Sequence, residues 1–233
     1  MDIFRFMLKS YLGDIEYCKR LIESFKLHNQ DSITLDIVVP TAEVSLFESF
    51  VDKNINVISE DTIPVNFAQE YINGIRPGYI NQEIVKLAFY KLRRTHSYLC
   101  LDSDAVFIRD FFLNDFINSS GRPYTVLVED RALNSNPEYF KQHWQLRETN
   151  LKKISNYLGI SEKDSLLTCH GFQIFESDIL EKMEIELLSP RGLEFLDLLK
   201  ISPYEFSWYN FFIQKNEIPV IVREPYFHVV HTG

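Results

Sequence analysis

Over residues 1–110, short apolar runs alternate with segments in which apolar residues recur every three or four positions. Cys18, Leu21 and Phe25 follow that helical spacing after Asp14, whose side chain is placed to cap the helix. Strands that alternate with helices are typical of an α/β sheet. We expect strands at 3–8, 35–39, 55–59 and 98–101, and helices from 14 to 29, through Val44, Phe47 and Val51, and over 80–92.

The second half of the chain has a less regular pattern, with no internal repeat, low-complexity segment or linker. We expect strands over 124–128 and 166–175, an extended stretch over 220–230, and helices over 134–157, from Ser177, near 192–199 and from Ser202. The two halves are therefore expected to share one mixed, mostly parallel central sheet flanked by helices, in a single α/β domain over 1–233.

Composition narrows the class of protein. The chain has 24 Lys and Arg against 33 Asp and Glu, a net charge of −9. Nucleic-acid-binding surfaces need clustered basic side chains, so this class of partner is excluded. The three widely spaced cysteines form neither a zinc motif nor a disulfide framework and suit a reducing cytosol. No apolar run reaches the ~18 residues of a membrane span. We expect a cytoplasmic protein, with peripheral association at the inner face of the membrane left open.

Candidate chemistry is concentrated where the predicted strand 98–101 runs into Asp102, Ser103 and Asp104. Ligands bind at the carboxyl ends of strands in open α/β sheets. Two carboxylates at alternate loop positions can hold a hard divalent cation, which can in turn bind a diphosphate. An isolated Asp-x-Asp is more often a solvated turn. The preceding apolar strand, and the need of an acidic chain for a local anion binder, favour a site.

This segment resembles the D-x-D motif of the GT-A glycosyltransferases, which binds the metal of a nucleotide-sugar complex. Further similar segments are KSYLGD at 9–14, QEIVKL at 82–87, HGFQ at 170–173, SPYEFSWY at 202–209 and VVH at 229–231. Together they look like a family of small, mostly uncharacterised GT-A-like proteins of bacteria and viruses. The resemblance covers nearly the whole chain. It implies a GT-A-type domain with a nucleotide-sugar-binding half, 1–110, and an acceptor-binding half, 111–233.

The resemblance also implies a metal site. Asp102 and Ser103 would contact the donor, and Asp102 and Asp104 would bind the metal. His231 would be the third protein ligand, with His228 as the alternative. Carboxylate and imidazole suit Mn²⁺, so Mn²⁺ or Mg²⁺ is the expected cofactor. Either histidine could instead bond a backbone carbonyl at a strand end.

Other donor contacts follow from the same resemblance. Tyr11 would stack on a uracil base, and Asp14 would accept a hydrogen bond from the base or ribose. Tyr11 could equally cover the sheet edge, and Asp14 could only cap its helix. His170 and Gln173 match the segment that contacts the donor sugar.

Lys86 is a candidate phosphate contact, with Arg76 and Arg109 as alternatives near the expected donor cleft. A lone lysine on a predicted helix more often lies on a solvated face.

Glu205 and Asp130 are the candidate catalytic carboxylates. In the glycosyltransferase interpretation, a carboxylate near Glu205 contacts the acceptor hydroxyl and, in an inverting enzyme, removes its proton. Ser202-Pro-Tyr-Glu205 also matches a capping box, in which Glu205 would only cap a helix. Asp130, with Glu129, follows the apolar run 124–128.

The resemblance implies a metal-dependent transferase that moves a sugar from a nucleotide diphosphate donor, expected to be a UDP-sugar, to a glycan or lipid-linked acceptor in surface polysaccharide synthesis. The same motif begins haloacid-dehalogenase-like phosphatases, in which Asp102 would be the nucleophile beside Mg²⁺. That class has the motif on its first strand, whereas three strand–helix units precede it here. A nucleotide-sugar-binding module without turnover is the third hypothesis.

Overall fold

The computed structural model of the chain describes residues 1–129, 137–161, 167–168, 172–223 and 228–231; at 128–129, 139–140, 142–146, 167–168 and 231 it describes the backbone alone. A five-stranded sheet of order β3-β2-β1-β4-β9 lies at its centre. The strands are β1 (Asp2–Lys9), β2 (Leu35–Val39), β3 (Ile55–Ser59), β4 (Thr95–Leu101) and β9 (Ile174–Glu176). β1 is parallel to β2 and β4, β2 is parallel to β3, and β9 is antiparallel to β4. The predicted mixed, mostly parallel sheet is confirmed.

Both faces of this sheet are buried. Successive side chains of a strand point to opposite faces, and in β1 Phe6 packs into one hydrophobic core and Met7 into the other. α1 (Ile15–His28) covers the first face and α3 (Pro77–Ala88) the second. A parallel sheet covered on both sides needs strands that are apolar throughout, which explains the short apolar runs in the sequence.

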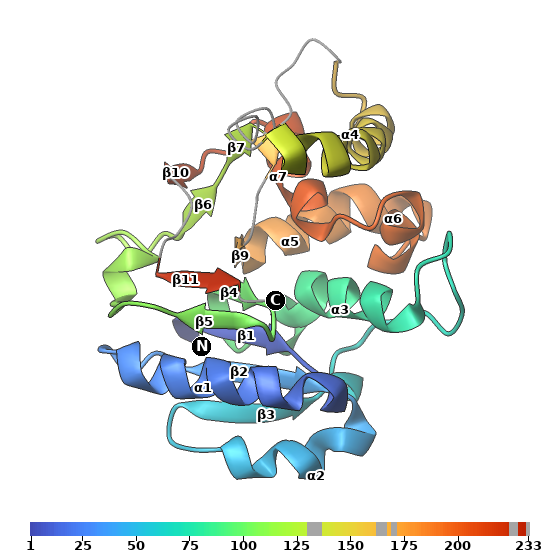
Figure 1. Cartoon of the computed structure of the whole chain (residues 1–233). Helices are drawn as coiled ribbons and strands as arrows, with labels where there is room; N and C mark the ends of the chain where they lie inside the picture. Colours follow the sequence, from blue (N-terminus) through green and yellow to red (C-terminus); the bar gives the residue numbers. More distant parts are fainter. Residues whose placement is uncertain (130–136, 162–166, 169–171, 224–227, 232–233) are drawn as a thin grey trace.

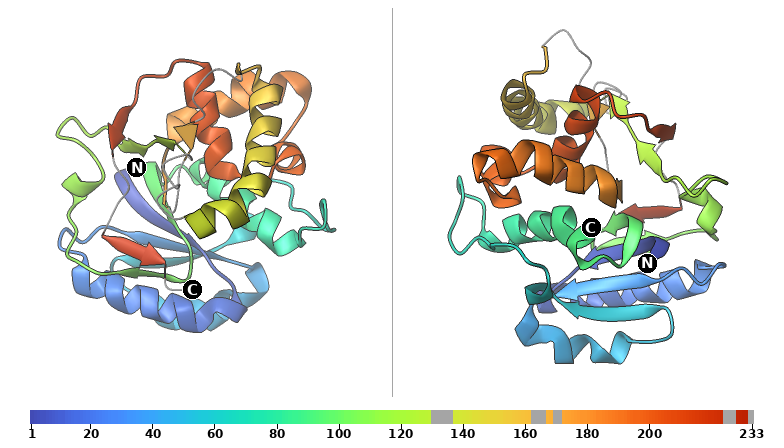
Figure 2. Two further views of the ribbon diagram at one scale, coloured as in Figure 1. Left: turned by 45° about the horizontal axis from the view of Figure 1, so that its top comes forward. Right: turned by 180° about the vertical axis from the view of Figure 1, so that it is seen from behind.

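The other helices are α2 (Val44–Phe47), α4 (Pro137–Leu158), α5 (Ser177–Met183), α6 (Phe195–Ile201) and α7 (Glu205–Lys215). In Figure 1, α5, α6 and α7 stack above α3, away from α1 and α2, and the rear view in Figure 2 shows the same arrangement. Among the described residues, no helix has the length and apolar character needed to cross a membrane.

Short strand pairs lie outside the central sheet. They are β5 (Ala105–Phe107) with β11 (Val229–His231), β6 (Tyr124–Val126) with β10 (Ile221–Arg223), and β7 (Val128–Glu129) with β8 (Leu167–Thr168). β11 is antiparallel to β5, with the backbone of His231 opposite Ala105. The last described strand therefore returns to the segment that directly follows β4.

The structure divides two predicted extended segments. The run 166–175 was expected to be one strand, but β8 ends at Thr168 and β9 begins at Ile174, with Gln173 outside both. Residues 172 and 173 lie outside any strand, and the two strands pair with different partners, β7 and β4. The stretch 220–230 likewise contains the separate strands β10 and β11.

Two predicted helix details are wrong. α2 ends at Phe47 and a 3-10 turn follows, so Val51 leaves the helical stripe and is 52% exposed. Asp14 makes no side-chain capping bond to α1. A 3-10 turn over Leu12–Asp14 precedes that helix, whereas a capping residue normally has an extended backbone.

Candidate active site

The Asp102-Ser103-Asp104 turn follows β4 where the strand order reverses. β2 and β3 lie on one side of β1 and β4 lies on the other. The ends of β1 and β4 therefore flank a topological switch point, where open α/β sheets bind ligands. The Ala105 amide donates to the Asp102 carbonyl at 3.0 Å and closes the turn. The segment thus lies at the end of a buried strand, as its sequence predicts.

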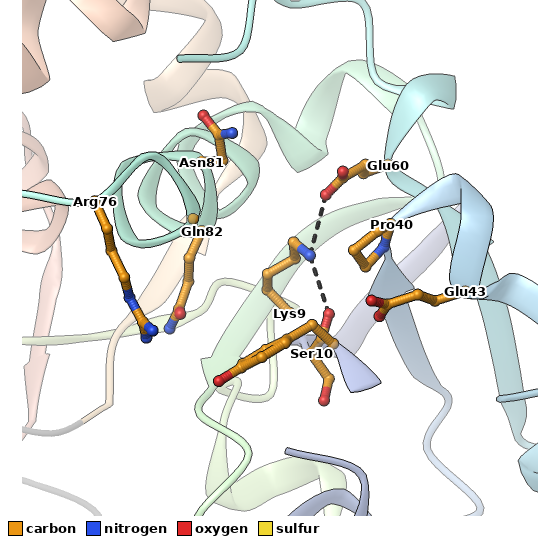
Figure 3. Close-up of a pocket in the computed structure, with 10 residues that line it drawn as sticks. Lys9, Ser10, Pro40, Glu43, Glu60, Arg76, Asn81 and Gln82 are labelled. Carbon is orange, nitrogen blue, oxygen red and sulfur yellow. Dashed lines mark hydrogen bonds and ion pairs between the residues drawn. The ribbon is translucent and has the colours of Figure 1, made fainter. Parts of the chain in front are cut away.

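A cavity of about 210 Å³ lies at the carboxyl ends of β1, β2 and β3. Figure 3 shows Gln82 of α3 and Arg76, the residue before this helix, on one side, Glu43 and Glu60 on the other, and Lys9 between them. The cavity is lined by Lys9, Ser10, Tyr11, Pro40, Glu43, Glu60, Arg76, Gly78, Asn81 and Gln82. Most of these side chains are polar, and they carry charges of both signs.

Two of the lining side chains are hydrogen-bonded to the Asp102-Ser103 segment. Gln82 Nε2 donates to Asp102 Oδ1 at 2.9 Å. Ser103 Oγ donates to Ser10 Oγ at 3.0 Å. The cavity and the Asp-x-Asp turn therefore form one continuous site.

Lys9 ends β1 in the cavity wall and was not predicted as a site residue. Its ammonium lies 3.0 Å from Glu60 Oε2 and donates to the Ser10 carbonyl at 3.0 Å. Burial lowers the pKa of Lys9, and the Glu60 carboxylate partly offsets this effect. The available sequence signal was a lysine at the end of an apolar strand, which does not identify the partner.

Lys86 is the centre of a buried charge cluster. Its Nζ lies 3.0 Å from Glu205 Oε1, 3.1 Å from Asp102 Oδ1 and 3.2 Å from Glu83 Oε2. The side chain is only 3% exposed, so the alternative of a solvated helix face is wrong. Contact between Lys86 and a phosphate stays a prediction, because its ammonium already faces three carboxyl groups from α3, the β4 end and α7.

The buried charges of the cluster shift the pKa values of Lys86 and Glu83. Burial alone would lower the pKa of Lys86, but the Asp102, Glu205 and Glu83 carboxylates outweigh it and raise this pKa well above its ordinary value. Burial, and then the Glu205 charge, raise the pKa of Glu83 well above its ordinary value. The cluster therefore favours the protonated form of both groups.

The structure excludes the capping role of Glu205. α7 begins at Glu205 itself, with Tyr204 at the capping position and no side-chain capping bond. The Ser202 hydroxyl is buried without a hydrogen-bond partner, so the predicted capping box does not form. The Glu205 carboxylate instead pairs with Lys86. Its catalytic role stays a prediction.

Tyr11 and Asp14 lie in the loop after β1. Tyr11 is 39% exposed and lines the cavity. Its ring lies so close to Gly13 that a Cβ there would collide with it. Asp14 lies in the 3-10 turn, where its amide donates to the Tyr11 carbonyl at 3.0 Å. Arg76 also lines the cavity, whereas Asp14 and Arg109 do not.

The side-chain amide of Gln173 is fully engaged within the protein. Its Oε1 accepts from the Val126 and Ile174 amides at 3.1 and 2.9 Å. Its Nε2 donates to the Val126 carbonyl at 3.0 Å and to Asn210 Oδ1 at 2.7 Å. A contact with a donor sugar stays a prediction, and it would have to replace one of these bonds.

The two candidate histidines lie at opposite ends of the β5–β11 ladder. The His231 backbone is opposite Ala105, the residue after Asp104, and its side chain lies outside what the structure describes. The His228 carbonyl accepts from the Ile108 amide. The His228 ring lies 3.8 Å from Asp115 Oδ1, and burial lowers its pKa. The ladder thus brings His231 to the Asp-x-Asp turn.

His170 and Asp130 are outside the described residues, as is the side chain of Glu129. Among the side chains that the structure describes, no three His, Cys, Asp or Glu residues are grouped to hold a metal ion. The predicted set includes His231, whose side chain is not among them. The metal site stays a prediction.

The chain belongs to a family described as a family of unknown function (DUF6492), which matches residues 4–229. No curated protein sequence matches it.

Two solved structures are similar to the chain. One is the apo form of mouse xyloside xylosyltransferase 1, with 12% identity, a TM-score of 0.49, and coverage of 95% of this chain and 84% of that one. The other is the apo structure of the bifunctional glycosyltransferase WbbM, with 16% identity, a TM-score of 0.47, and coverage of 91% of this chain and 37% of that one. These similarities do not assign an activity to this chain.

Proposed function

We propose that this member of the DUF6492 family is a GT-A-type glycosyltransferase that moves a sugar from a UDP-sugar to a glycan or lipid-linked acceptor. The observation that carries the proposal is the position of the Asp102-Ser103-Asp104 turn. It follows β4 at the switch point of the sheet and is hydrogen-bonded to the wall of a polar cavity. The resemblance of this segment to the GT-A motif supplies the reaction class.

The cavity would take the nucleoside part of the donor. Its volume of about 210 Å³ is smaller than the roughly 300–1,000 Å³ typical of whole-ligand pockets. It is therefore suited to part of a nucleotide sugar, with the diphosphate extending along Gln82 toward Asp102. Tyr11 offers an exposed ring for stacking on the base. Arg76 lies beside the N-terminus of α3, which favours negative charge.

The residues near the turn fit a divalent cation. Asp102 and Asp104 provide hard oxygen ligands, and the β5–β11 register brings the His231 backbone to the next residue. Such a donor set suits Mn²⁺ or Mg²⁺. When bound, the cation would offset charge on the leaving diphosphate.

For catalysis, Glu205 is the described candidate and Asp130 the second. Glu205 Oε1 is held by Lys86, which keeps a carboxylate beside the Asp-x-Asp turn. A role as general base would require the acceptor hydroxyl to reach this carboxylate.

The phosphatase alternative is less consistent with the fold. It requires the aspartate motif on the first strand of the domain, whereas the motif here follows β4, with β1, β2 and β3 earlier in the chain. We therefore keep the transferase as the proposed function.

A thermal-shift series with UDP, GDP, CMP and buffer, each with and without Mn²⁺, tests the proposal, with Asp104→Ala as the control. A ligand at 100 times its Kd stabilises the folded protein by about 2.7 kcal/mol. We expect UDP with Mn²⁺ to raise the Tm of the wild type alone. Release of UDP from UDP-sugars then separates a transferase from a binding module. No shift with any nucleotide would overturn the proposal.

A further inference from the structure

Glu83 is the one member of the Lys86 cluster for which the proposed reaction has no use. It lies on α3, one turn before Lys86, and its side chain is 3% exposed. Its Oε2 is within 3.2 Å of the Lys86 ammonium, yet it accepts no hydrogen bond of good geometry. A buried polar atom without a hydrogen bond is unfavourable. We therefore looked for a role of Glu83 in its contact with Lys86.

Helix α3 contributes Gln82, Glu83 and Lys86 to the site. Gln82 and Lys86 are one turn apart, a spacing that puts both on the same helix face. Both contact the same atom, Asp102 Oδ1, at 2.9 and 3.1 Å. The position of Asp102, which is 31% exposed, therefore depends on where Lys86 is held.

Lys86 is in turn held by groups other than Asp102. Glu205 Oε1 accepts from its ammonium at 3.0 Å, and the Phe206 ring lies 5.0 Å from it. Glu83 Oε2 also lies 3.2 Å from this ammonium. Glu83 on α3 and Glu205 on α7 therefore hold Lys86 together.

We propose that Glu83 is a positioning residue of the active site, which acts through Lys86 to hold Asp102 in place for donor binding. Its consequence for the donor rests on the proposed function. The positioning itself concerns the protein alone. Residues that orient the ligands of a site typically change affinity 10–100-fold when they are removed.

The experiment compares wild type with Glu83→Leu and Glu83→Gln. The leucine has no oxygen atom to face the Lys86 ammonium, whereas the glutamine amide keeps one. Isothermal titration calorimetry measures the Kd of UDP with Mn²⁺, and thermal unfolding measures Tm. We expect Glu83→Leu to weaken binding about 10-fold and Glu83→Gln to restore most of this loss. Glu83→Ala replaces the leucine variant if that variant does not fold.

Asp36→Asn is the matched control for a loss of stability alone. Asp36 is fully buried and pairs with Arg5 and Arg94. It lies near the start of β2, at the opposite end of the strands from the site. We expect this variant to lower Tm without weakening UDP binding.

A second readout needs no ligand. The ammonium NMR signal of Lys86, identified by its absence in Lys86→Arg, reports how firmly this group is held. We expect the signal in wild type and Glu83→Gln, and its broadening by faster exchange with water in Glu83→Leu.

An unchanged Lys86 signal and UDP affinity in Glu83→Leu would overturn the role of Glu83. The role of Glu83 would also be overturned if Glu83→Leu and Asp36→Asn had the same Tm and Glu83→Leu lost no more UDP affinity than Asp36→Asn. If the wild type binds no nucleotide, the proposed function fails, and the NMR comparison still decides the positioning role.

Discussion

Removal of the Lys86 ammonium tests the electrostatics of the cluster most directly. In Lys86→Met the aliphatic bulk is kept, and Asp102 and Glu205 lose the positive charge between them. Coulomb's law at an effective dielectric constant of about 20 gives about 5.5 kcal/mol for a 3.0 Å ion pair, the Lys86–Glu205 distance. Desolvation offsets part of this gain, and removal of one partner of a buried pair typically destabilises by about 3–5 kcal/mol.

The stability lost in Lys86→Met is also expected to depend on pH. Burial raises the folded-state pKa of Glu83, and without Lys86 this pKa also loses the lowering effect of the lysine charge. A raised folded pKa means that stability is fully present below the unfolded pKa, about 4, and is lost as pH rises toward the folded value. The deficit of Lys86→Met should therefore be smaller at pH 5 than at pH 7.5.

Urea unfolding of wild type, Lys86→Met and Lys86→Met/Glu205→Gln at these two pH values measures the effect. We expect the double variant to recover part of the deficit, because it removes one of the unpaired charges. A deficit below about 1 kcal/mol, the range of exposed ion pairs, or an equal deficit at both pH values would refute the reasoning.

Three further predictions concern other parts of the molecule. Asp36→Asn should lower the free energy of unfolding by roughly 3 kcal/mol, because Arg5 and Arg94 lose a buried partner. Denaturant unfolding measures this loss, and a value near zero would contradict the prediction. Gly13→Ala should displace the Tyr11 ring and weaken UDP binding with little change in Tm, and equal affinities in calorimetry would show that the ring does not contact the base. Glu205→Gln keeps an oxygen that can accept from Lys86, so it should retain UDP binding and stop sugar transfer, whereas normal turnover would exclude this carboxylate as the base.

The position of Asp102 was predictable because its signal is local. An apolar strand that stops at a carboxylate can be read from a few residues, and the ends of parallel strands meet at one edge of the sheet. The role of α1 and α3 in covering the sheet followed in the same way from helical spacing.

The environment of Lys86 was not predictable by these means. Its Glu205 partner is 119 positions away in the sequence, and only the packing of α7 against α3 brings the two together. The local capping motif around Ser202 was misleading for the same reason. In the structure the Glu205 carboxylate pairs with Lys86, whereas the motif predicts that this carboxylate caps a helix.

The return of β11 to β5 has a consequence for how the protein folds. The residues that flank the Asp-x-Asp turn pair with a strand at positions 229–231, and β4 takes its last neighbour from positions 174–176. Contacts between such distant segments form slowly, because a long loop must close before they stabilise anything. Residues 1–110 expressed alone would leave the outer edge of β4 unpaired, and an open strand edge invites aggregation. The site is therefore expected to form last during folding, after distant segments of the chain have come together.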